Sequence, residues 1–225
     1  MKMEISLTKP QSNFMKLIAI TAMLIDHIGV ILFPQYILFR VIGRIAFPLF
    51  AYQIGIGYQF TRNIKRYILR LFLFGVGIQL FYFLFSAFTG EDPFYLNIFF
   101  TLFFGLAAIF CYSTKRYILL AAVVAVPLLS PLVGVTFDYG VCGVLLILGL
   151  YAAKGNFIKI ALVTVVLAAA NSYLLGWTVQ LFSIAALLFI IKPFPLKMKI
   201  PSGAFYVFYP LHLAVLYLID TLRRL

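Results

Sequence analysis

Acidic and metal-binding side chains are scarce in this sequence. Only 6 of the 225 residues are Asp or Glu, against 18 Lys or Arg, and the chain carries 2 histidines and 2 cysteines. Cys111 and Cys142 have no CxxC or metal-ligand spacing, so we interpret them as small apolar residues inside helices. We therefore expect no metal. There is also no repeat of about 20–50 residues, which excludes a solenoid.

Charge of either sign is limited, and this excludes a soluble domain. Charged residues make up 11% of the chain and hydrophobic residues 64%. Apolar runs follow one another without a linker long enough to hide a second domain, so we expect a single all-α domain over residues 1–225, a polytopic helical bundle in a lipid bilayer. The net charge of +12 indicates no nucleic-acid partner, because the basic residues lie between apolar runs.

The apolar runs predict nine transmembrane helices. Their approximate bounds are residues 15–33, 36–60, 67–88, 95–112, 117–134, 138–153, 157–175, 177–191 and 203–222. Lys and Arg concentrate in the N-terminal tail and the even-numbered connections, whereas Glu91, Asp92 and Asp138 fall in odd-numbered ones. The positive-inside rule then places the N-terminus in the cytoplasm, and nine crossings leave the C-terminus outside.

The first predicted helix contains an acid and an imidazole where a membrane span should be apolar. Asp26 and His27 lie past the middle of the apolar run at residues 17–33. A carboxylate at the centre of a span costs at least ~2.5–3.5 kcal/mol on insertion scales. These two residues therefore indicate either a structural pairing or chemistry.

Two arginines of the second predicted helix are candidates for that pairing. The connection between the two helices is short, so they form a tight antiparallel hairpin. At 1.5 Å per residue, Asp26 lies roughly 12 Å from the turn, Arg40 roughly 9 Å and Arg44 roughly 15 Å. We expect Asp26 to pair with either arginine. The other arginine then needs a second acid or an anionic ligand, and Asp138 is the candidate acid.

Further polar residues fall in the outer half of the predicted bundle. We interpret Asn97, Tyr139 and Asp220 as helix caps or interfacial side chains. His212 lies near the middle of the last predicted helix, two residues after Pro210, which removes a backbone hydrogen bond. The sequence leaves His212 open between packing and function.

Lys16 and His27 share one face of the first predicted helix. Eleven residues separate them, roughly three full turns plus ~20°, which places His27 about 16 Å deeper than Lys16. A cation at the cytoplasmic mouth and a titratable imidazole at depth suit a ligand with an anionic head and a reactive far end. Coenzyme A has this shape.

Several stretches together resemble the TraX family, which is named for the conjugation protein that acetylates pilin. They are LIAITAMLIDHIGVILFP, RVIGRIAFPLFAY, GYQFTRNIKRYILRL, NIFFTLFFGL, DYGVCGVLLIL and FYPLHLAVLYLI. The resemblance implies a multi-pass acetyltransferase of the bacterial cytoplasmic membrane that uses acetyl-CoA. TraX proteins are related at fold level to membrane acyltransferases that O-acetylate surface polysaccharides and to the lysosomal heparan N-acetyltransferase type.

Two basic motifs of those polysaccharide acyltransferases have similar counterparts here. Their Arg-x10-His pattern, which carries the catalytic histidine, is similar to Lys16-x10-His27 with Lys in place of Arg. Their Arg-x-x-Arg motif is similar to Arg62-x-x-Lys65. The resemblance thus implies that the CoA phosphates bind basic residues at the cytoplasmic face, namely Lys16, Arg62, Lys65 and Arg66.

Residues and resemblance lead to one hypothesis. The thioester reaches His27, which deprotonates an amine or hydroxyl acceptor arriving from the outer side. Arg40 or Arg44, with Asn97 as a neutral donor, stabilises the oxyanion or holds an acidic acceptor, and Asp26 sets the arginine geometry. In an alternative within the same hypothesis, His212 is the base and His27 orients it.

Two other functional classes stay open. One is a small proton-coupled secondary transporter, with a relay through Asp26, His27 and Arg44, although the sequence shows no internal duplication. The other is a non-catalytic membrane scaffold. For an acyltransferase, the sequence leaves open a peptide, glycan, polyol phosphate or lipid-headgroup acceptor, N- or O-acylation, the acyl chain length, and whether the protein is a homo-oligomer.

Overall fold

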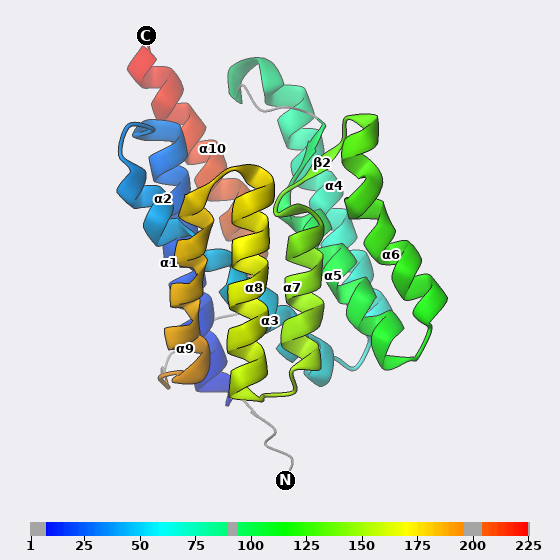
Figure 1. Cartoon of the computed structure of the whole chain (residues 1–225). Helices are drawn as coiled ribbons and strands as arrows, with labels where there is room; N and C mark the ends of the chain where they lie inside the picture. Colours follow the sequence, from blue (N-terminus) through cyan, green and yellow to red (C-terminus); the bar gives the residue numbers. More distant parts are fainter. Residues whose placement is uncertain (1–7, 90–93, 196–203, 225) are drawn as a thin grey trace. The chain divides into compact units, whose positions relative to one another are not determined.

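A computed structural model describes residues 8–89, 94–195 and 204–224; Glu91 and Asp92 lie outside them. The chain forms two compact units. We call Ala51–Val163 the central unit, and Lys2–Phe50 together with Thr164–Leu225 the terminal unit. α3 (Ala46–Phe60) and α8 (Phe157–Leu175), both labelled in Figure 1, each contain residues of both units. The single domain expected over residues 1–225 stays a prediction.

Each of the nine predicted segments contains helix, so the all-α prediction is confirmed. Within the described residues, the helices long and apolar enough to cross a membrane are Lys9–Leu32, Ile37–Phe60, Ile64–Leu84 and Phe157–Leu174. Four shorter apolar helices are Ile98–Ser113, Tyr117–Val133, Gly140–Ala152 and Thr178–Ile191. The chain therefore has the helices of a membrane protein, and the number of crossings and the orientation of the termini stay predictions.

The central unit is a set of helices packed around α5. Its elements, besides parts of α3 and α8, are α4 (Ile64–Thr89), β1 (Tyr95–Leu96), α5 (Ile98–Ser113), α6 (Tyr117–Leu129), η1 (Ser130–Val133), β2 (Thr136–Phe137) and α7 (Gly140–Ala152). α5 packs against α4, α6 and α7. A Cβ at Gly105 of α5 would run into the Ile147 side chain of α7, so this glycine permits the close approach of the two helices.

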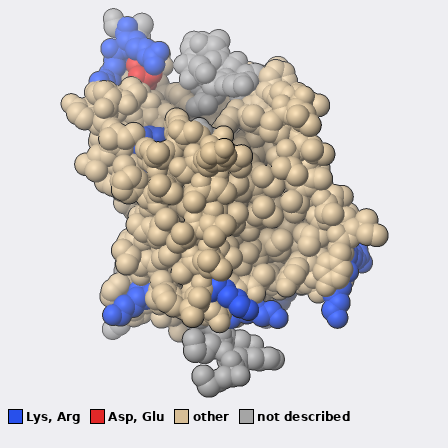
Figure 2. Space-filling model, in the orientation of Figure 1, with Lys and Arg blue, Asp and Glu red and all other residues tan. Residues whose placement is uncertain are grey.

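Helix direction gathers the basic loops of the central unit at one end. β1 and β2 pair in parallel and lead into α5 and α7, so both helices start at the same end. Short connections then bring the start of α4, the α5–α6 turn and the α7–α8 turn to the opposite end. The Lys and Arg residues there are Arg62, Lys65, Arg66, Lys115, Arg116, Lys154 and Lys159. Figure 2 shows Lys and Arg at helix ends and uncharged surface along the helices.

The terminal unit is organised around α1 (Lys9–Leu32), which packs against α2 (Ile37–Gly43) and α10 (Ala204–Arg224). The remaining elements are η2 (Thr178–Ala186), which is a 3₁₀ helix and lies against α2, and α9 (Leu187–Ile191). The Arg223 side chain of α10 donates to the Leu32 carbonyl over 3.1 Å. That bond satisfies a carbonyl of the last turn of α1.

Local details differ from the sequence prediction at several points. The predicted helix at 36–60 is divided, because Pro48 lacks the N–H that would bond the Arg44 carbonyl, and α2 ends at Gly43 before α3 begins at Ala46. The predicted helix at 177–191 begins as the 3₁₀ helix η2. Tyr95–Leu96, predicted as helix, forms β1.

Candidate active site in the terminal unit

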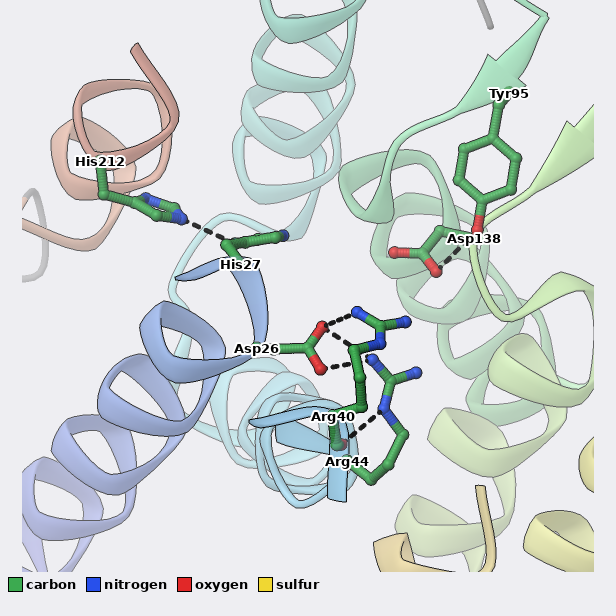
Figure 3. Close-up of polar contacts among 7 residues, drawn as sticks. All are labelled: Asp26, His27, Arg40, Arg44, Tyr95, Asp138 and His212. Carbon is green, nitrogen blue, oxygen red and sulfur yellow. Dashed lines mark hydrogen bonds and ion pairs between the residues drawn. The ribbon is translucent and has the colours of Figure 1, made fainter. Parts of the chain in front are cut away.

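Asp26 of α1 binds both arginines of the predicted hairpin (Figure 3). Arg40 Nη1 lies 2.7 Å from Asp26 Oδ2, and Arg44 Nη2 lies 2.7 Å from each carboxylate oxygen. The Asp26 side chain is 13% exposed and that of Arg44 is 6% exposed, so the ion pairs are largely desolvated. The predicted pairing is confirmed, and it includes both arginines where the sequence offered a choice of one.

Gly43 creates the space for this cluster. It is buried in the last turn of α2, and a Cβ built on it would overlap the carboxylate of Asp26. The guanidinium carbon of Arg40 lies 5.3 Å from the centre of the Trp177 ring, a cation–π geometry. The cluster is therefore held between a glycine contact and an aromatic face.

His27 lies beside Asp26 and forms a hydrogen-bonded pair with His212 of α10. His27 Nδ1 and His212 Nε2 are 2.8 Å apart, and His212 Nδ1 is 2.8 Å from the Phe208 carbonyl oxygen. The His212 ring stacks on Phe208, with centroids 4.8 Å apart and planes at 14°. Tyr209 meets both imidazoles edge-on. His212 is 6% exposed, and the contacts lock its ring in place.

The hydrogen bonds specify the tautomers of the two neutral rings. A carbonyl oxygen only accepts, so Nδ1 of His212 carries the proton and donates to Phe208. Nε2 of His212 is then an acceptor, and Nδ1 of His27 donates to it. The lone pair of His27 consequently lies on Nε2. This nitrogen is on the far side of the ring from His212 (Figure 3).

The structure places Asn97 and Asp138 in the central unit. The Asn97 amide nitrogen donates to the Gly75 carbonyl over 2.9 Å and to Gln79 Oε1 over 3.0 Å, while its oxygen caps α5 at the Phe99 N–H. Both amide N–H groups are thus used within the protein. This arrangement matches the helix-cap interpretation, and donation by Asn97 to a substrate stays a prediction that requires breaking one of these bonds.

Asp138 lies at the start of α7, next to the β1–β2 pair. Its carboxylate accepts a hydrogen bond from the Tyr95 hydroxyl over 3.1 Å (Figure 3). Its carbonyl accepts one from the Thr101 hydroxyl. Asp138 therefore contributes to the end of the central unit at which α5 and α7 begin. Its predicted role as a second acid for the arginines stays a prediction.

The residues predicted to hold CoA phosphates lie at helix ends or along α1. Lys16 is half-buried on α1, in the terminal unit, whereas Arg62, Lys65 and Arg66 are exposed around the start of α4, in the central unit. Asn63 caps α4 by accepting from the Arg66 N–H over 3.0 Å. Within the described residues, no three His, Cys, Asp or Glu side chains come together as metal ligands.

Sequence reasoning missed a polar set on α8 and η2. Asn171, Gln180 and Ser183 are 8%, 4% and 6% exposed. Within residues 8–89, 94–195 and 204–224, none of these side chains makes a hydrogen bond to the protein. Trp177, Gln180 and Ser183 recur at a spacing of three residues, as in a 3₁₀ helix, whereas the apolar run around them predicts an α-helical span. This spacing of three is the sequence signal from which the buried polar residues could have been identified.

The fold and the site define an all-helical membrane protein with a buried histidine pair beside an Asp–Arg–Arg cluster. The family model described as "TraX protein" matches residues 11–220. The chain therefore belongs to the TraX family, and the predicted resemblance is confirmed.

Two curated relatives are similar to this chain. A "probable fimbrial assembly protein FimC, serogroup H1" of Dichelobacter nodosus is 29% identical over 90% of this chain and 92% of its own length. An uncharacterized protein of Rickettsia prowazekii (strain Madrid E) is 39% identical over 69 residues, which are 31% of this chain and 26% of that protein. No solved structure matches the chain.

Proposed function

We propose that this protein is a transmembrane acyltransferase that moves an acetyl group from acetyl-CoA to an amine or hydroxyl acceptor. His27 is the general base, and His212 positions it. The observation that carries the proposal is the chain of hydrogen bonds from Phe208 through His212 to His27, which leaves the Nε2 lone pair of His27 available. Membership of the TraX family, which is named for a conjugation protein that acetylates pilin, supports the reaction type.

The chemistry requires one proton transfer in each direction. Nε2 of His27 removes the proton from the acceptor amine or hydroxyl as the acceptor attacks the thioester carbonyl carbon. The new C–N or C–O bond forms, the C–S bond breaks, and the CoA thiolate takes the proton back from the imidazolium. In between, the imidazolium keeps its Nδ1–H bond to neutral His212. The neighbouring Asp26 carboxylate offsets the charge of the arginines around it.

The arginine cluster has a second part in the proposal. Arg40 and Arg44, fixed by Asp26, provide positive potential near His27, where negative charge develops on the thioester oxygen. Preorganised cations of this kind act strongly in a water-poor site. Lys16, Arg62, Lys65 and Arg66 hold the CoA phosphates at the cytoplasmic side, and the relation to polysaccharide and heparan acyltransferases belongs to this proposal as well.

The acceptor in this proposal is a pilin-like peptide amine or hydroxyl on the outer side. The Dichelobacter relative, named as a probable fimbrial assembly protein, supports a pilin-related role. The protein then acts as a multi-pass protein of the bacterial cytoplasmic membrane, as one domain with nine crossings. Glycan and lipid-headgroup acceptors are the alternatives to include in an acceptor panel.

The test uses purified full-length protein in lipid nanodiscs with acetyl-labelled CoA. The acceptor panel is a synthetic peptide with a free N-terminal amine, a serine-containing peptide blocked at its N-terminus, a short oligosaccharide, and glycerol phosphate as a lipid-headgroup analogue. His27→Asn should reduce transfer by about 10²- to 10⁴-fold, the usual effect of losing a general base, and retain CoA affinity. Asp220→Asn, in the surface pair with Arg224 at the end of α10, is the matched control and should behave as the wild type.

Other results would exclude the proposal. Wild-type protein that binds no acetyl-CoA cannot be this enzyme. A pH-driven flux in proteoliposomes that depends on Asp26, His27 and Arg44, with no acetyl transfer, would identify the transporter instead.

A further inference from the structure

η2 has an unusual length and an inverted distribution of side chains. It runs for 9 residues, whereas 3₁₀ helices rarely exceed about 3–4. Side chains three apart eclipse one another in a 3₁₀ helix, so Gln180, Ser183 and Ala186 form one row. All three are buried, whereas Leu181 and Phe182 are 42% and 51% exposed. The buried face of η2 is therefore its polar face.

The two polar members of the row have no hydrogen-bond partner among the side chains and backbone groups that the structure describes. Gln180 is 4% exposed and Ser183 is 6% exposed. In the described part of the chain, neither side chain forms a hydrogen bond. Among the described residues, Ser130 Oγ alone is a fully enclosed side-chain polar atom without a partner, so the polar atoms of Gln180 and Ser183 keep some access from outside the packed chain although both residues are largely buried. These side chains are available to a ligand that both donates and accepts hydrogen bonds.

The contacts of η2 show how far along α1 the row of Gln180, Ser183 and Ala186 lies. η2 lies against α2, and Trp177 stacks on Arg40 just before η2 begins. Three residues of 3₁₀ helix rise about 6 Å, the same as four residues of α-helix. Gln180 thus lies one turn beyond Trp177, as Arg44 lies one turn beyond Arg40. This is the level of Gly43 and of Asp26, which Gly43 contacts.

The row continues from that level toward the start of α1. Ser183 lies about 6 Å beyond Gln180 along the helix axis. After α9, the Pro193 carbonyl accepts from the Gln11 side chain in the first turn of α1, over 3.4 Å. η2 and α9 therefore run antiparallel to α1, from the level of the Asp26 cluster toward the end of α1 that carries Lys16.

We propose that Gln180 and Ser183 bind the pantetheine arm of the acyl donor. This inference rests on the proposed function, in which the thioester lies at His27 and the phosphates at the cytoplasmic end. The arm has two secondary amides, each with one donor and one acceptor, separated by slightly more than one peptide repeat, roughly 5 Å. An amide and a hydroxyl with a spacing of about 6 Å match these groups. The row also runs from the level of the Asp26 cluster, beside His27, toward the end of α1 that carries Lys16, where the proposed function places the acyl donor.

The experiment compares two acyl donors and two variants. Gln180→Leu and Ser183→Ala should each raise KM about three- to tenfold for acetyl-CoA and equally for acetyl-pantetheine, which lacks the nucleotide, because each loses one hydrogen bond. KM for the acceptor should stay unchanged. Lys16→Gln should raise KM for acetyl-CoA alone. Thr178→Val, a change on the exposed side of η2, is the matched control.

Stability separates ligand binding from a structural role. Because the Gln180 amide has no partner in the described protein, Gln180→Leu should keep or raise Tm in detergent without substrate. A lowered Tm together with a wild-type KM for both acyl donors would assign Gln180 to folding and overturn the inference. A raised acceptor KM with unaltered donor KM would assign the row to the acceptor and also overturn it. Failure of wild-type protein to bind acetyl-CoA, by contrast, overturns the proposed function itself.

Discussion

The histidine pair makes the sharpest prediction, because His27 and His212 are expected to have different roles. His212→Phe keeps an aromatic ring against Phe208 and Tyr209 but offers His27 no acceptor. A lost hydrogen bond is worth about 0.5–1.5 kcal/mol, and 1.36 kcal/mol is a factor of ten in rate, so misorientation alone gives about 2- to 13-fold. Loss of the tautomer bias adds to this. We expect a total reduction in kcat of about 10- to 100-fold, as for other partners that orient a histidine.

The conservative variant distinguishes a positioning residue from a base. In His212→Gln, the side-chain oxygen reaches about the position of Nε2 and accepts from Nδ1 of His27, so activity should recover to within a few-fold of wild type. The assay is kcat at saturating acetyl-CoA, with CoA affinity measured by calorimetry. If His212→Phe and His212→Gln are both as inactive as His27→Asn, with CoA binding intact, then His212 is the base.

Spectroscopy tests the tautomers without any mutation. The chain has only 2 histidines, so histidine labelled with ¹⁵N in the ring gives four nitrogen signals. At neutral pH we expect protonated Nδ1 and unprotonated Nε2 in both rings, since His212 donates to the Phe208 carbonyl and His27 donates to His212. A protonated Nε2 on neutral His27 would refute the assignment of the base.

Three further predictions concern the scaffold and the topology. Asp26→Asn leaves two mostly buried arginines less compensated and should cost about 3–5 kcal/mol of stability, read as a lower Tm in detergent; unchanged Tm and activity would show that Asp26 neither supports the hairpin nor organises the site. Gly43→Ala should cost about 1–3 kcal/mol because the new Cβ overlaps the Asp26 carboxylate, whereas Gly77→Ala, with no atom within 4 Å of the new Cβ, should be neutral or stabilising. In a background without Cys111 and Cys142, a cysteine at Thr136 should react with an impermeant thiol reagent outside whole cells and one at Lys115 should not; the reverse pattern would invert the topology.

The hairpin could be predicted from the sequence because its geometry is local. A short turn and a rise of 1.5 Å per residue place Asp26 within reach of Arg40 and Arg44 whatever the rest of the chain does. The involvement of both arginines depends on Gly43, whose missing side chain makes room for the carboxylate. A sequence pattern shows the charged residues, but it does not show that the missing Cβ of Gly43 makes room for them.

The histidine pair could not be predicted in the same way. His27 and His212 are 185 residues apart in sequence, and each was identified only as a polar residue inside an apolar run. Their pairing depends on the packing of α10 against α1. Gln180 and Ser183 were missed for another reason. They lie three residues apart, which places them on one face of an α-helix as well as in one row of a 3₁₀ helix, but Gln and Ser carry no charge that would mark them as unusual in an apolar segment.

The relative direction of helices bears on the crossing number more directly than helix length does. In the terminal unit, Arg223 near the end of α10 bonds the carbonyl of Leu32 at the end of α1, and His212 pairs with His27 further back along both helices. α1 and α10 therefore run in the same direction. If both span the bilayer, parallel first and last helices require an odd number of crossings, as the charge pattern predicts.

In the central unit, Lys and Arg gather at the end opposite the β1–β2 pair, which is the arrangement that a cytoplasmic basic face requires. An even number of crossings would need η2 and α9, the shortest pair, to enter and leave on one side. Their path from Trp177 beside Arg40 to Pro193 beside Gln11 follows α1 over most of its length instead.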